Sequence, residues 1–133
     1  MRFFFDNNIA PVIARSLHEL SKDDGHRVVH LREKFAVDTP DIIWIGSLAT
    51  EKWWTVVSGD IQMSRKKHEA KAWQDSGLTV FFLAKGWNNL KFWDKAWRIV
   101  RWWPSIIEYV EADNKGAFIV SSNFNGKFTR INL

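Results

Sequence analysis

Short apolar runs alternate with amphipathic stretches from residue 2 to residue 84. Four runs rich in Phe, Val and Trp have the length of buried strands, and they span residues 2–5, 26–31, 53–60 and 78–84. Between the first two runs, apolar side chains recur at helical spacing over residues 9–20. This alternation of strand and helix predicts a mostly parallel sheet with helices on both faces.

Capping residues and prolines indicate where two of the helices begin. Asn7 or Asn8 can cap the first helix, which then carries Pro11 in its first turn. Thr39 can cap the next helix, with Pro40 at the first helical position. We therefore expect each helix to begin directly after these polar residues.

The second half of the chain carries the remaining structural signals. Ser64 can cap a polar helix that Gly77 ends. Pro104 is expected to kink or end a Trp-rich amphipathic helix, and Asn125-Gly126 predicts a hairpin between two strand-like runs. The elements together predict an α/β fold in one domain over residues 1–133. We expect a three-layer sandwich with a mostly parallel central sheet and a C-terminal β-hairpin at its edge.

Composition narrows the chemistry. The chain has no Cys, which excludes disulfides and thiolate metal sites and fits a reducing cytoplasm. No signal peptide and no apolar run of about 20 residues is visible, so we expect a cytoplasmic protein with no membrane partner. The net charge of +4 permits a polyanionic partner. Exposed rings can stack on bases, and the candidates are Trp53, Trp54 and Trp87.

Acidic residues follow two of the predicted strands. Asp6 ends the first and Asp60 ends the third, so their carboxylates share one crevice if those strands are neighbours. Asp41, or Asp38 from the same loop, can overhang that crevice. Clustered carboxylates repel each other unless a divalent cation such as Mg²⁺ or Mn²⁺ offsets the repulsion.

Each acid also has an ordinary structural interpretation. Asp6 can cap a helix, and Asp60 can belong to a turn. Asp41 in a first helical turn gains about 0.3–1 kcal/mol from the helix dipole. Spacing alone leaves both interpretations open.

Four segments occur in a fixed order: FFFDNNIAPVIARSL, HRVVHL, DTPDIIWI and WTVVSGDIQMSR. They resemble the PIN-like domains of VapC-type toxin ribonucleases from bacterial toxin–antitoxin systems. The resemblance implies a Mg²⁺- or Mn²⁺-dependent endoribonuclease that acts on RNA and is silenced by a cognate antitoxin. It also implies the site residues: metal ligands and catalytic acids at Asp6, Asp41 and Asp60, with supporting residues at Asn7, Asn8 and Ser58.

The sequence departs from the family pattern at two positions. Asn7 stands where many relatives have Glu, and Gln62 stands where some have a second Asp. Fewer acids leave the number of metal ions open between one and two. Glu69 can compensate by reaching the site through water, or it can belong to a solvated helix face.

Basic residues near the third strand are candidates for binding RNA phosphates. Arg65, Lys66 and Lys67 follow that strand directly, and Arg15 lies on the first helix. The same run can equally be a solvated helix face. The Trp-rich stripe from Trp93 to Trp103 favours packing, with an antitoxin or homodimer contact as the second interpretation.

Two other functions are compatible with the acids. The first is a degenerate PIN-like module that binds nucleic acid or a protein partner without cleaving RNA, which the absence of acids at Asn7 and Gln62 suggests. The second is a phosphoacceptor receiver domain, which also clusters acids at strand ends. The acidic pair and downstream Lys of a receiver are poorly matched here.

Overall fold

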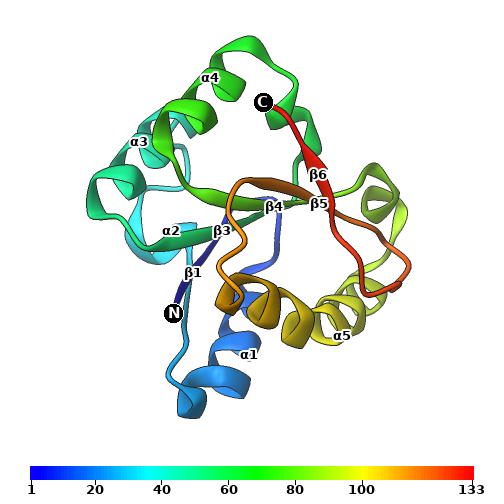
Figure 1. Ribbon diagram of the computed structural model, residues 1–133. Coiled ribbons are helices and arrows are strands. Elements are labelled where there is room, and N and C mark those ends of the chain that lie inside the picture. Colours follow the sequence, from blue (N-terminus) through cyan, green and yellow to red (C-terminus); the bar gives the residue numbers. More distant parts are fainter.

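A computed structural model describes all residues from Met1 to Leu133 and arranges them in three layers (Figure 1). The six strands are β1 (Arg2–Phe5), β2 (Arg27–His30), β3 (Trp54–Ser58), β4 (Thr79–Leu83), β5 (Ala117–Val120) and β6 (Thr129–Ile131). The helices are α1 (Pro11–Ser21), α2 (Leu31–Lys34), α3 (Asp41–Glu51), α4 (Lys67–Ser76) and α5 (Phe92–Glu111). Three short 3₁₀ helices are η1 (Lys22–Asp24), η2 (Ile61–Ser64) and η3 (Lys85–Asn89).

The strands form one sheet in the order β2-β1-β3-β4-β5-β6. All pairs are parallel except β5 with β6, which is antiparallel at the edge. Helices α3 and α4 cover one face, and α1 and α5 cover the other (Figure 1). The predicted fold class is confirmed, including the antiparallel C-terminal edge.

The side chains of β1 point alternately to the two faces of the sheet, and each set belongs to a separate hydrophobic core. Phe3 and Phe5 pack into the cluster beneath α1 and α5, which includes Trp103. Phe4 points the other way and packs with Trp44 beneath α3 and α4. Because both faces are covered, β1 is apolar at every position after Arg2.

At three helices, the side chains that were expected to cap the amino end do not cap it. Helix α1 begins after Ala10, α3 after Pro40 and α4 after Lys66, each without a side-chain cap. Thr39 and Ser64 instead donate their hydroxyl groups to the carbonyls of Ala36 and Ile61. Neither Asn7 nor Asn8 caps α1, because the helix begins further along the chain, with Ala10 at the N-cap position.

Pro104 does not end the Trp-rich helix. Helix α5 is continuous from Phe92 to Glu111 with Pro104 inside it. The proline removes the hydrogen bond to the carbonyl of Val100, one turn earlier. Both residues are exposed, so water can satisfy that carbonyl.

The Trp-rich stripe divides between core and surface. Trp103 is buried, as the packing interpretation predicts, whereas Trp93 and Trp97 are 80% and 54% exposed. None of the helices combines the length and the apolar character that crossing a bilayer requires.

Candidate active site at the carboxyl edge of the sheet

The carboxyl ends of β1 and β3 meet at one edge of the sheet. The two strands are parallel neighbours with Phe5 opposite Val57, and the backbone N–H of Asp6 donates to the Val57 carbonyl at 3.3 Å. Because β1 and β3 are neighbours, Asp6 and Asp60, which follow them, lie at the same edge of the sheet. We call this part of the molecule, with Asp6, Asp41 and Asp60, the acidic edge.

Asp6 is buried and held by three donors. Its Oδ1 accepts the backbone N–H groups of Asn8 and Gly59, each at 3.1 Å. Its Oδ2 accepts the Ser58 hydroxyl at 2.5 Å, and Ser58 Oγ itself accepts the backbone N–H of Asp60. Ser58 and the backbone of Asn8 are thus in place to orient the carboxylate.

The pKa of the Asp6 carboxyl is raised well above its ordinary value. Burial raises the pKa of Asp6 from 3.8 to about 6, against the lowering effect of its three hydrogen bonds. The charge of Asp41 makes a smaller contribution to this rise of the pKa. Asp6 forms no ion pair. A cation placed beside it would therefore stabilise the ionised form.

Asp41 and Asp60 occupy different positions relative to Asp6. Asp41 opens α3, is half-buried, and accepts the indole N–H of Trp44 at 3.0 Å. Asp60 caps η2 by accepting the backbone N–H of Gln62 at 3.0 Å. Asp41 shifts the pKa of Asp6, whereas Asp60 is not among the groups that do so.

The donor set fits a hydrated ion better than a closed protein cage. No group of three or more Asp, Glu or His side chains lies close enough together to hold a metal ion. Mg²⁺ commonly keeps several waters and binds proteins through one or two carboxylates. Asp6 and Asp41 are the two carboxylates of the acidic edge that interact electrostatically, and the buried Asp6 forms no ion pair.

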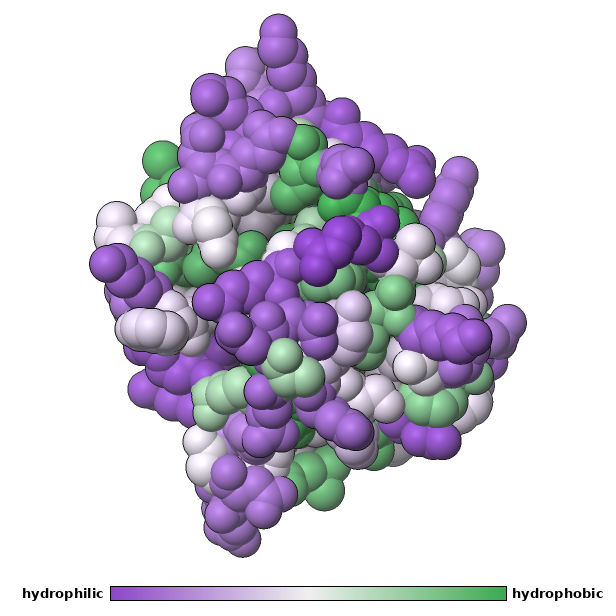
Figure 2. Space-filling model, in the orientation of Figure 1, coloured by the Kyte–Doolittle hydropathy of each residue, from purple (hydrophilic) through white to green (hydrophobic).

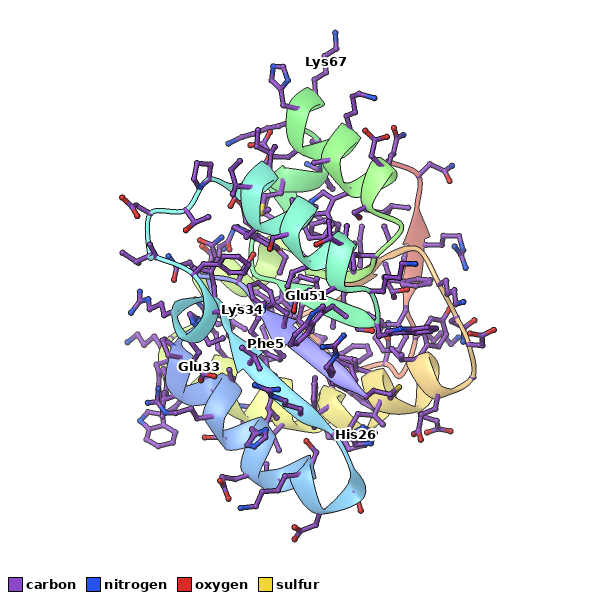
Figure 3. All side chains as sticks on the ribbon, turned by 90° about the vertical axis from the view of Figure 1, so that its left-hand side faces the viewer. Phe5, His26, Glu33, Lys34, Glu51 and Lys67 are labelled. Carbon is purple, nitrogen blue, oxygen red and sulfur yellow. The ribbon has the colours of Figure 1, made fainter.

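The basic residues predicted to bind RNA are exposed. Arg65, Lys66 and Lys67 stand just before and at the start of α4, which forms the strongly hydrophilic upper end of the molecule (Figures 1 and 2). Figure 3 shows Lys67 at the amino end of α4, well away from Phe5, the residue before Asp6. Arg15 is exposed on α1.

Other candidate side chains also have defined environments. Glu69 is half-buried on α4 and forms no ion pair. Trp54 and Trp87 are buried at 4% and 2% exposure, so neither can stack on a base. The stacking interpretation is therefore wrong for these two rings.

Trp53 lies at the opposite edge of the sheet. It is 81% exposed and lines a cavity of about 580 Å³ at the amino ends of β1, β3 and β4, together with Arg2. Residues from the carboxyl ends of α3, α4 and α5 line the same cavity. Trp53 therefore lies at the other end of the parallel strands from Asp6 and Asp60.

A family model described as a PIN like domain matches residues 1–85. The chain belongs to the PIN-like domain family. The match includes all three acids and ends after β4, the fourth of the parallel strands. PIN-like domains are usually nucleases, so the fold is of a nuclease type. Searches of curated proteins and of solved structures give no match.

One residue near the PIN-like acidic edge was not found from the sequence. Arg32 follows β2, the strand next to β1, and its side chain is hydrogen-bonded to Asn7. The signal was its position in HLREKF, directly after a parallel strand. Its neighbours in space became clear only when the strand order was known.

Proposed function

We propose that this protein is a Mg²⁺- or Mn²⁺-dependent endoribonuclease and the toxin of a toxin–antitoxin pair. The observation that carries the hydrolase proposal is the state of Asp6, which is buried, without a counterion, and close to the charge of Asp41. A purely structural link between β1 and β3 needs only a hydrogen-bonding side chain. An ionisable group with a perturbed pKa is typical of a functional site.

The chain's own residues would prepare the site for hydrolysis. A divalent ion held by Asp6 and Asp41 would polarise the scissile phosphate and lower the pKa of a bound water. Ser58 and Gly59 keep the Asp6 carboxylate in one orientation through hydrogen bonds. Asp60, at the same edge, is available to orient water through its free carboxylate oxygen.

The proposed antitoxin surface is the apolar face that α5 leaves exposed. Trp93, Trp97 and Val100 recur at helical spacing and are 80%, 54% and 42% exposed. Large exposed rings at such spacing are typical of partner contacts. A homodimer is the alternative occupant of this face.

Mn²⁺ is expected to raise the melting temperature, and more strongly at about pH 8 than at about pH 5. The ion binds the folded state, and stabilisation reaches about 2.7 kcal/mol at 100 times its Kd. With a pKa of about 6, Asp6 is mostly protonated at the lower pH, and the proton competes with the ion. Thermal denaturation with Mn²⁺ or EDTA measures this. Equal shifts in the wild type and in Asp6→Asn would contradict it.

Cleavage of a single-stranded RNA pool tests the proposed activity directly. We expect cleavage with Mn²⁺ or Mg²⁺, none with EDTA, and a rate that rises as the pH passes through about 6, because Asp6 must ionise to bind the ion. Metal binding and a fully folded protein with no cleavage of any RNA would contradict the endoribonuclease proposal.

A binding module without activity is the second candidate. It is favoured by one observation: the acids do not form a group of three that could hold a metal ion. This candidate predicts salt-sensitive RNA binding that no divalent ion converts into cleavage.

A further inference from the structure

Arg32 is a cationic side chain attached directly to the Asp6-Asn7-Asn8 turn. It follows β2, whose carboxyl end lies beside that of β1. Its Nε donates to Asn7 Oδ1 at 3.0 Å, and Asn7 Nδ2 donates to the Val37 carbonyl at 2.9 Å. The bond to Val37 fixes which end of the Asn7 amide faces Arg32.

A buried contact holds the backbone of Arg32 as well. The ring of His30 is fully buried, and its Nδ1 accepts the backbone N–H of Arg32 at 3.1 Å. Its Nε2 donates to the Ile9 carbonyl at 2.7 Å. Main chain and side chain of Arg32 are thus both tied to residues 7–9, so the guanidinium has a defined place at Asn7, the residue that follows Asp6.

The Arg32 guanidinium has no counterion. It forms no ion pair with any carboxylate, and it is not among the groups that shift the pKa of Asp6. Asn7 is a neutral acceptor, so it holds the guanidinium without cancelling its charge. The side chain is exposed, and its two terminal Nη groups make no hydrogen bond within the protein.

We propose that Arg32 binds a phosphate of the RNA backbone beside the acidic edge, and that Asn7 positions it. This assignment rests on the proposed function, because a strand that crosses the acidic edge brings further phosphates next to the scissile one. Arginine binds phosphate through two parallel N–H groups, and the bond from Nε to Asn7 leaves both Nη groups for that purpose. Asn7 is thereby a positioning residue for Arg32.

The test measures binding of a fluorescein-labelled single-stranded RNA oligonucleotide of mixed sequence in EDTA at several salt concentrations. Arg32→Ala is expected to weaken binding about tenfold at low salt. It should also reduce the slope of log K against log salt by about 0.7, the value for one phosphate contact on a single strand. Arg27→Ala is the matched control, because Arg27 is exposed at the amino end of β2. It should leave affinity and slope unchanged.

Two further variants separate charge from position. Asn7→Asp turns the neutral acceptor into a counterion. It should therefore weaken RNA binding and reduce the salt slope as Arg32→Ala does, although Arg32 is intact. Arg32→Lys keeps the charge but loses the paired N–H groups, so it should weaken binding severalfold and retain the slope. Urea denaturation confirms that each variant is folded.

Wild-type cleavage with Mn²⁺ is measured in parallel, so that the two proposals can fail separately. If the wild type cleaves RNA while Arg32→Ala and Asn7→Asp bind with unchanged affinity and slope, the role of Arg32 is overturned and the ribonuclease proposal stands. If the binding losses occur and the wild type does not cleave, Arg32 keeps its assignment and the chain is a binding module. A folded wild type that binds no RNA overturns both.

Discussion

Asp6→Asn is expected to abolish RNA cleavage and to stabilise the folded protein at about pH 8. If Asp6 holds the ion as proposed, its loss removes several kcal/mol of transition-state stabilisation, which corresponds to about a 10³-fold loss of rate or more. The stability gain follows from the buried charge, because ionising Asp6 in the folded state costs free energy that a neutral amide avoids. Since the pKa of Asp6 rises from 3.8 to about 6, we expect a gain of about 1–3 kcal/mol.

The pH dependence of this gain identifies its origin. Between about pH 4 and pH 6 the folded wild type holds a proton on Asp6 that the unfolded chain has released. The free energy of unfolding of the wild type therefore falls as the pH rises through this range. The Asp6→Asn variant has no ionisable group at this position, so its stability lacks this part of the pH dependence. The difference between the two proteins should be small near pH 4 and complete near pH 8.

The hydrogen bonds of Asp6 can survive the substitution. The Asn Oδ1 can accept the N–H groups of Asn8 and Gly59, and its amide nitrogen can donate to Ser58 Oγ. The Ser58 hydroxyl can then turn to Met63 Sδ, which lies 3.6 Å away. Urea denaturation in EDTA at several pH values measures the effect.

An exposed acid provides the matched control. Asp23→Asn makes the same change at an exposed position outside the site and should alter stability by less than about 0.5 kcal/mol at any pH. If Asp6→Asn lowers stability equally at low and high pH, the carboxylate serves mainly as a structural link.

Gly59→Ala is expected to destabilise the protein by about 1–3 kcal/mol and to reduce cleavage at least about 10²-fold. A Cβ at Gly59 would lie 2.8 Å from the Asn8 Cβ and 3.0 Å from the Asn8 carbonyl oxygen. The Asn8 turn and the end of β3 must therefore move apart. That movement displaces the Gly59 N–H from Asp6 Oδ1, which it now contacts at 3.1 Å. Urea denaturation and the RNA cleavage assay measure both effects.

Gly46→Ala is the control for this substitution. Gly46 lies inside α3, where an added Cβ would meet no atom beyond its chain neighbours and the helix backbone within 4 Å, so alanine should stabilise the helix by about 0.5–1 kcal/mol and leave cleavage unchanged. Adding Asn8→Gly to Gly59→Ala removes the closest contact and should restore part of the activity. If Gly59→Ala is as stable as the wild type and cleaves RNA at the same rate, the turn tolerates a Cβ and the prediction is wrong.

The sequence pattern predicted the strands, the helices between them and the edge of the sheet at which Asp6 and Asp60 lie. The buried strands are short apolar runs, and the helices between them have an apolar face, so the period of the sequence identifies both. Covered parallel strands end at a common edge, which is why Asp6 and Asp60 could be placed there. Family membership, now shown over residues 1–85, agrees with the order of those motifs.

Tertiary structure alone decided which partners each polar side chain has. Asp6 is linked to Gly59 across 53 positions, and Asn7 to Arg32 across 25. Thr39 and Ser64, expected as helix caps, bond to nearby carbonyls, whereas Asp60 caps a 3₁₀ helix that the sequence did not predict. Local propensity fixes the backbone of a short segment. The burial, charge state and hydrogen bonds of its side chains depend on strands that are neighbours only in the folded sheet.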